Sequence, residues 1–84
     1  MFKIDFVYNR ETLYINVEGI LNKKNIIKVK DRLYSILNKY SISNIVLDVK
    51  KTNILDEIAF YNFLDDYDCK YDGSLKLIEL SQVS

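Results

Sequence analysis

Histidine, proline and tryptophan are absent from this sequence, and its 84 residues include one cysteine and two glycines. Without histidine, the chain lacks the usual general base near neutral pH and the commonest metal ligand. Cys69 has no second cysteine for a disulfide and no histidine to activate it as a nucleophile. Gly19 and Gly73 stand alone, which excludes a glycine-rich phosphate-binding loop. The sequence therefore predicts a protein that is not an enzyme and uses no cofactor.

Acidic residues form two further candidates for a reactive site. Asp56 and Glu57 are adjacent, and adjacent side chains on a helix point about 100° apart, which does not suit a catalytic pair. Four acids near the C-terminus lack the glycine and the closing glutamate of a calcium loop, and we interpret them as a solvated helix end: Asp65, Asp66, Asp68 and Asp72. Neither candidate predicts catalysis or metal binding.

Long hydrophobic runs and an excess of one charge are also missing. No apolar run approaches about 18 residues, and no basic start precedes an apolar stretch with a cleavage site, so we expect a cytoplasmic protein without membrane insertion. Twelve basic and twelve acidic residues give a net charge of zero, which argues against nucleic acid as a partner. With 49% hydrophobic and 29% charged residues, the chain is predicted to fold as one globular domain over residues 1–84.

Alternation of apolar and polar residues predicts two strands at the start of the chain. Residues 2–8 alternate as in a half-buried strand, and residues 13–17 do so again after a polar break at 9–11. We expect these strands to pair antiparallel, with Gly19 ending the second one.

Two more strands are predicted further along. Residues 45–49 are short, β-branched and almost continuously apolar, as expected of a central strand covered on both faces. Asp72 and Gly73 then turn the chain into a last strand that contains Leu75, Leu77 and Leu80.

The period changes to that of a helix in two places. Residues 25–40 place six apolar side chains on one helical face: Ile26, Val29, Leu33, Ile36, Leu37 and Tyr40. Asp56 is a suitable N-cap for a second helix that reaches about Tyr67, with five residues on its core face: Ala59, Phe60, Phe63, Leu64 and Tyr67. The resulting order is β-β-α-β-α-β, an α/β fold with a small mixed sheet and both helices on one side.

Charge is distributed unevenly between the two helical regions. Residues 22–51 contain eight basic and two acidic residues, a net charge of +6, whereas residues 52–73 contain six acidic residues and one basic, a net charge of −5. Two solvated helix faces would explain this pattern equally well. Functionally, it predicts a domain that steers a partner of matching polarity, or its own twin, by electrostatic attraction.

The second helix also carries apolar residues on its outer face. Ile58 and Tyr61 are spaced i, i+3 and fall opposite the predicted core face, beside Glu57, Asn62 and Asp65. A single exposed apolar residue needs no explanation, but two neighbours at a helix start form a candidate contact patch. We therefore predict a partner-binding surface there, formed by Asp56, Glu57, Ile58, Tyr61, Asn62 and Asp65.

Three segments of the sequence resemble the STAS domain of bacterial anti-sigma-factor antagonists. Residues 13–22 are similar to the family's strand and exit "L-x-V-x-L-x-G-x-L-D", and residues 45–49 to its strand "I-V-L-D-L". The family pattern "LDLSxVxFIDSSGLGxLL" aligns with residues 47–64 without a gap, and the last strand followed by Ser81 resembles "G-x-L-x-L-x-x-x-S". The resemblance implies a STAS-like fold and a function in regulating transcription through a protein partner such as an anti-sigma factor.

The departures from the family pattern affect its regulatory site. Asp56 matches the motif aspartate, but Glu57 takes the place of the phosphorylatable serine and Ile58 that of the next serine. Ala59 and Tyr61 replace two glycines, and Asn22 replaces the strand-exit aspartate. We therefore expect no phosphoserine switch, although Glu57 at a helix N-terminus offers about one permanent negative charge.

The resemblance leaves other functions open. Family domains commonly continue with another helix, strand and helix, so the chain is expected to be C-terminally truncated relative to them, with an unprotected edge strand that favours a weak homodimer. An accessory subunit of a membrane transport complex is an alternative function, since some STAS-like proteins have that role. A nucleic-acid contact through Lys24, Lys28 and Lys39 is a third.

Overall fold

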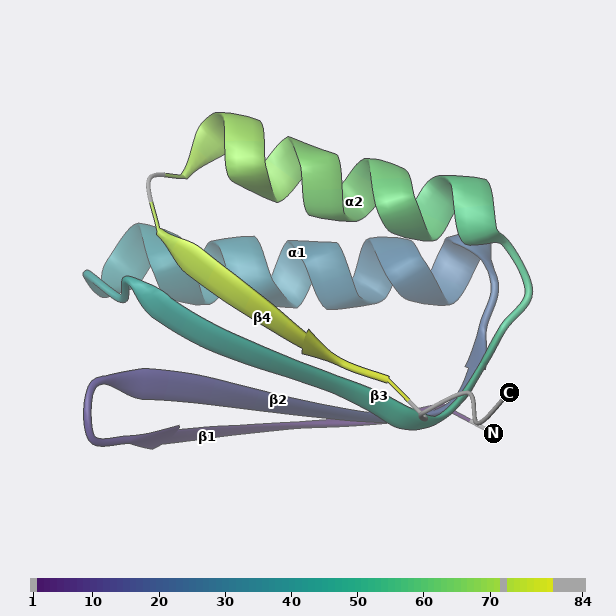
Figure 1. Cartoon of the computed structure of the whole chain (residues 1–84), viewed down its shortest axis with the longest axis horizontal. Coiled ribbons are helices and arrows are strands. Elements are labelled where there is room, and N and C mark those ends of the chain that lie inside the picture. Colours follow the sequence, from purple (N-terminus) through teal and green to yellow (C-terminus); the bar gives the residue numbers. More distant parts are fainter. Residues whose placement is uncertain (1, 72, 80–84) are drawn as a thin grey trace.

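Two helices pack side by side on one face of a four-stranded sheet in the computed structural model, which describes residues 2–71 and 73–79 (Figure 1). The elements follow the predicted order: β1 (Phe2–Asn9), β2 (Thr12–Leu21), α1 (Lys23–Lys39), β3 (Asn44–Ile54), α2 (Glu57–Lys70) and β4 (Ser74–Ile78). The sheet order is β1-β2-β3-β4, with β1 antiparallel to β2 and the other pairs parallel. The predicted α/β class, mixed sheet and one-sided helices are confirmed.

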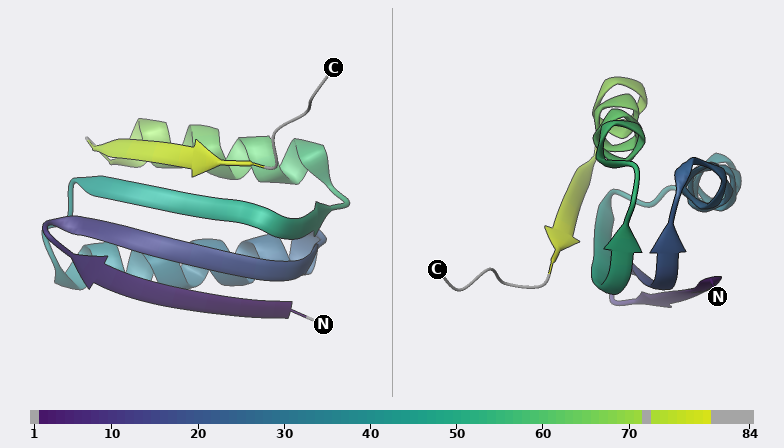
Figure 2. Two further views of the ribbon diagram at one scale, coloured as in Figure 1. Left: turned by 60° about the horizontal axis from the view of Figure 1, so that its bottom comes forward. Right: turned by 90° about the vertical axis from the view of Figure 1, so that its right-hand side faces the viewer.

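Each helix covers a different half of the sheet. Figure 2 shows α1 behind β1 and β2, and α2 behind β3 and β4. Helix α1 follows β2 and α2 follows β3 along the chain. Because β2 and β3 are parallel, both helices begin at the same end of the sheet and run back across it. Among residues 2–71 and 73–79, no helix covers the opposite face of the sheet, and the prediction that residues 45–49 are covered on both faces is wrong. Ile45, Leu47 and Val49 are buried beneath the helices, whereas Val46 and Asp48 on the other face are half-buried.

Several predicted boundaries of strands and helices differ from those in the structure. Gly19 does not end the second strand, which continues to Leu21: Gly19 has a φ of 105°, which glycine adopts readily, and it stays paired with Thr52 just after a register irregularity between Asn16 and Glu18. Helix α1 begins two residues earlier than predicted, at Lys23, because the side chain of Asn22 caps it. Helix α2 continues past Tyr67 to Lys70. Asp72 and Leu80, which were predicted in the last turn and strand, lie outside the described residues.

The hairpin between β1 and β2 has a tight turn. Asn9 pairs with Thr12, so Arg10 and Glu11 alone form the loop. Both have positive φ, 50° and 64°, as a type I′ turn requires. Glycine and asparagine are the usual residues in this geometry, so the pairing of β1 with β2 holds two ordinary residues in the left-handed region.

Among the described residues, the core between sheet and helices consists of aliphatic and aromatic residues, with the hydroxyl of Tyr67 as a buried polar group: Leu13, Ile15, Val17, Leu21, Ile26, Val29, Leu33, Ile45, Leu47, Val49, Phe60, Phe63 and Tyr67. Phe60, Phe63 and Tyr67 confirm the predicted inner face of α2. The inner face of α1 is shorter than predicted, because Tyr40 lies beyond its last residue and is 62% exposed.

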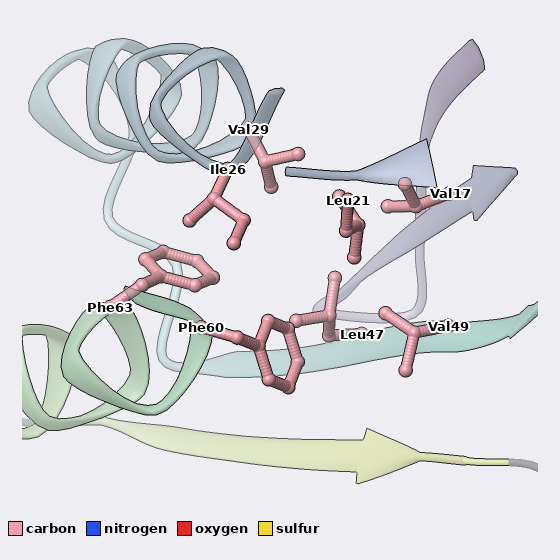
Figure 3. A pocket seen from close by; sticks show the side chains of 8 residues that line it. All are labelled: Val17, Leu21, Ile26, Val29, Leu47, Val49, Phe60 and Phe63. Atoms are coloured by element: carbon pink, nitrogen blue, oxygen red, sulfur yellow. The ribbon is translucent and has the colours of Figure 1, made fainter. Parts of the chain in front are cut away.

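Phe60 and Phe63 meet strand and α1 side chains around a small cavity in this core (Figure 3). The cavity has a volume of about 10 Å³ and its lining is apolar, so a water inside it would lack hydrogen-bond partners. It is a packing defect, too small for a ligand.

Candidate partner-binding surface

The start of α2 is fixed by two sets of hydrogen bonds. The Oδ1 of Asp56 accepts a hydrogen bond from the backbone N–H of Ala59 at 3.0 Å, which confirms Asp56 as the N-cap. Just before it, the N–H of Leu55 donates to the carbonyl of Leu21 at 3.0 Å. This bond ties the entry of α2 to the end of β2, where Asn22 caps α1 through the N–H of Asn25 at 2.9 Å. The two helix starts are thereby held next to each other at one end of the sheet.

Ile58 and Tyr61 both face solvent, as the helical periodicity predicted. Ile58 is 77% exposed and Tyr61 is 50% exposed, although the intervening Phe60 is fully buried. The ring of Tyr61 rests edge-on against that of Phe60, with 5.5 Å between ring centroids. Tyr61 is thus held by its buried neighbour and still presents half of its surface.

A third exposed apolar residue lies just before the helix and was missed by the sequence analysis. Leu55 precedes the N-cap and is 59% exposed. Leu55 lies outside the helix, so helical periodicity does not predict that its side chain is exposed. The sequence does show that it precedes Ile58 by three residues. We call Leu55, Ile58 and Tyr61 the α2 patch.

The remaining predicted site residues have different positions around the α2 patch. Glu57, Asn62 and Asp65 are exposed and form a polar rim. Asp56 is half-buried, and its carboxylate is already engaged by the helix backbone. The structure therefore places Asp56 as the cap that fixes the start of α2 and the other five predicted residues between Glu57 and Asp65 of that helix.

The other end of the helix pair is closed by aromatic and charged contacts. The rings of Tyr34 and Tyr71 lie edge to face at 5.1 Å, and Tyr67 stacks on Tyr71 at 5.5 Å. The Nζ of Lys70 lies 4.9 Å above the ring of Tyr34. Sequence analysis had placed Tyr67 in the core but missed this three-tyrosine cluster, because it joins residues from α1 and α2 that only tertiary packing brings together.

An ion pair crosses between the helices beside this cluster. The Nζ of Lys30 lies 2.8 Å from the Oδ2 of Asp66, and this hydrogen bond raises the pKa of Lys30. Burial raises the pKa of the Tyr34 and Tyr67 hydroxyls, and neither hydroxyl has a hydrogen-bond partner among the described residues. Part of the charge difference between the two helices is therefore satisfied within the molecule, because Asp66 of the acidic α2 pairs with Lys30 of the basic α1.

Groups suited to metal binding do not come together in the described part of the chain. It contains no cluster of three or more histidine, cysteine, aspartate or glutamate residues placed to hold a metal ion. Cys69 is free and exposed near the end of α2. None of the helices described between residues 2 and 79 is long and apolar enough to cross a membrane.

Comparison with known proteins supports the fold and leaves the partner open. No protein-family model and no curated protein matches the sequence. Among solved structures, the chain is similar to the crystal structure of an antisigma-factor antagonist, a STAS domain from Rhodobacter sphaeroides. The TM-score is 0.64 at 16% sequence identity, and the match covers 92% of this chain and 85% of the other. The STAS resemblance seen in the sequence is confirmed at the level of the fold.

Proposed function

We propose that the chain is a non-enzymatic interaction module of the STAS type, which regulates transcription in the cytoplasm by binding a protein partner. An anti-sigma factor or a related regulator is the class of partner that the resemblance implies. The observation that supports the proposal is the α2 patch, an exposed apolar surface at the start of the helix where the family pattern, aligned by sequence resemblance, has its regulatory serines.

The chemistry of the α2 patch suits a protein contact. An isoleucine and a tyrosine side by side on a fixed helix offer apolar area, and tyrosine is enriched among residues that dominate interface energies. Glu57, Asn62 and Asp65 supply the polar rim that surrounds such a centre. The N-cap bond of Asp56 and the Leu55–Leu21 bond hold this surface in place before binding, which limits the entropy lost on association.

In this proposal the module is not switched by phosphorylation at the usual position. Glu57 has no hydroxyl to accept a phosphoryl group, and its carboxylate already places a negative charge in the first turn of α2. Thr52, the nearest upstream hydroxyl, is half-buried and donates a hydrogen bond to the carbonyl of Val49 at 2.6 Å. The interaction is therefore constitutive, with Glu57 as a permanent acid at the binding surface.

Affinity capture from the native host, followed by binding measurements with the partner it identifies, tests the proposal. Truncating both Ile58 and Tyr61 to alanine should weaken binding by about 2 kcal/mol or more, roughly 30-fold. Ile27→Ala is the matched control, since Ile27 is a 47% exposed isoleucine on α1 and its truncation should leave binding unchanged. Glu57→Lys should chiefly slow association and reduce its salt dependence.

Two outcomes contradict the proposal. A folded double variant that binds at full strength removes the α2 patch from the interface. Capture of a membrane transport complex in place of a transcriptional regulator replaces the regulatory function with that of a transporter subunit.

Incubation with the host's anti-sigma kinases and ATP tests the missing phosphoswitch. Peptide mapping should find no phosphate between Asn53 and Leu64, because Glu57 and Ile58 occupy the two serine positions. Stoichiometric phosphate on Thr52 or Tyr61 would show that another hydroxyl has taken over the switch.

A further inference from the structure

Strand β1 is a long, regular edge strand. It lies at the end of the sheet order and pairs with β2 on one side along all eight of its residues, without an irregularity. Natural edge strands are commonly protected by shortness, proline, a bulge, an inward-pointing charge or charged side chains along the edge. Between Phe2 and Asn9, β1 has only the last of these, as the exposed and oppositely charged Lys3 and Asp5. The other edge strand, β4, has five residues. Within the described part of the chain, the outer backbone groups of β1 have no strand partner and form the longer open template for another strand.

The apolar side of β1 is incompletely covered by its own molecule. Phe2, Ile4 and Phe6 point toward the helix layer and pack against the core, yet all three stay half-buried. Two hollows run along this edge between β1 and α1. One of about 430 Å³ is lined by residues that include Phe6, Tyr8 and Tyr40, and one of about 600 Å³ is lined in part by Phe2 and Ile4.

The outer side of β1 carries one charge of each sign. Lys3 and Asp5 are exposed and flank Ile4 symmetrically in the sequence. In an antiparallel pair of identical strands centred on Ile4, Lys3 of each copy lies opposite Asp5 of the other, and Phe2 lies opposite Phe6. Opposite charges directly across a strand pair stabilise it, and like charges destabilise it.

Other registers are worse for the same strand. Centring on Lys3 or Asp5 places two like charges directly opposite each other, and centring on Phe6 leaves both charges without a partner. A shift by one residue turns the helices of the two copies to opposite faces and sets apolar side chains beside charged ones. The sequence of β1 is thus self-complementary in one register.

We propose that β1 pairs antiparallel with β1 of a second copy of this chain, about a twofold axis at Ile4, to form one continuous eight-stranded sheet. The axis keeps the helices of both copies on the same face and brings their α1 helices next to each other. Lys28 and Arg32 of α1 line the hollow beside β1 with one acid, Asp31, so the two α1 helices repel each other. A short strand pairing opposed by this repulsion gives a weak dimer, in the high micromolar range at about 0.15 M salt.

This surface is separate from the proposed partner site, since α2 covers β3 and β4 at the other side of the sheet (Figure 2). Failure of either proposal therefore leaves the other standing.

Sedimentation equilibrium on charge variants of the full chain tests the pairing. Asp5→Lys should raise the dimer dissociation constant about tenfold, because both symmetric pairs change from attraction to repulsion. Lys3→Asp should act in the same direction, and the double variant Lys3→Asp/Asp5→Lys should restore the affinity to within about threefold, because it regenerates the opposite pairs. Lys76→Asp, an exposed change on β4, is the matched control and should leave the dimer unchanged.

Thermal melting of each variant separates dimer loss from unfolding. Asp5 pairs with the neutral Asn16 on β2, so Asp5→Lys should leave the monomer's melting temperature nearly unchanged. Lys3 pairs with Glu18, and Lys3→Asp should cost the monomer slightly more, which makes Asp5→Lys the principal variant. A strict monomer at millimolar concentration overturns the proposal. So does a dimer that ignores Asp5→Lys, that the double variant fails to restore, or that Lys76→Asp weakens equally.

Discussion

The two ends of α2 differ in how far their large hydrophobic side chains are exposed to solvent. At its start, Ile58 and Tyr61 are exposed, and Leu55 beside them is exposed as well. At its far end, Tyr67 is fully buried and Tyr71 half-buried, and they join Tyr34 in an aromatic cluster flanked by two lysines. Residue type therefore does not decide the role of these side chains. One end of the helix stabilises the fold, and the other end presents apolar surface to solvent.

The largest expected effect comes from two neighbours on α2, Phe60 and Tyr61. Phe60→Ala should lower the free energy of unfolding by about 3–5 kcal/mol, because it leaves a cavity in the core beside the existing one. Tyr61→Ala should cost about 1 kcal/mol or less, most of it from the lost edge contact with Phe60. Urea unfolding of both variants measures the difference. Equal losses would mean that Tyr61 belongs to the core.

A smaller effect, of opposite sign, is expected at the closed end. The Tyr67 hydroxyl is buried without a protein partner among the described residues, so Tyr67→Phe should raise the free energy of unfolding by about 1 kcal/mol. Tyr61→Phe is the control, since its ring is half exposed and the change should be neutral. A clear loss of stability in Tyr67→Phe would indicate that the hydroxyl makes a hydrogen bond in solution.

Alkaline pH should weaken the closed end selectively. Burial raises the pKa of Tyr34 and Tyr67 above the ordinary 10.0, so above about pH 10 the unfolded state releases these protons while the folded state retains them. Stability from these groups is fully present below pH 10 and is lost as the pH rises through the folded-state values. Lys30, whose pKa is also raised, acts in the same direction. Urea titrations from pH 8 to 11 should show falling stability, with a shallower fall in Tyr67→Phe.

The smallest effect is expected at the ion pair between the helices. Lys30 and Asp66 are partly exposed, so Lys30→Met should cost about 0.2–1 kcal/mol at low salt and less at high salt. Part of that cost arises from the lost contact of Lys30 with the ring of Tyr34, 5.6 Å from its Nζ. Thermal melting at two salt concentrations measures both parts. A salt-independent loss would assign the whole effect to packing.

Periodicity in the sequence predicted the order of elements and most inward-facing residues. Alternation and helical spacing are local signals, and they placed Phe60, Phe63 and Tyr67 inward and Ile58 and Tyr61 outward. The N-cap was also predictable from local sequence, because Asp56 accepts its hydrogen bond from Ala59, which is only three residues away.

Features that depend on distant contacts were missed. The tyrosine cluster requires α1 and α2 to pack, and the exposure of Leu55 depends on the turn between β3 and α2. The apolar run at 45–49 was interpreted as covered on both faces, because a continuous apolar run does not reveal which face the helices occupy. Gly19 was taken as a stop, whereas a glycine with positive φ equally serves a strand that bends and continues.

The tight turn at Arg10 and Glu11 has a consequence for how the chain folds. It makes the β1–β2 pairing a contact between near neighbours in sequence, whereas each parallel pairing closes a loop that spans a whole helix. Hairpins form in about 1–10 μs, and longer loops cost more entropy to close, so this pair is expected to form first. During synthesis its residues also leave the ribosome before those of α1 and β3. The early hairpin then supplies β2 as the template on which the parallel strands assemble.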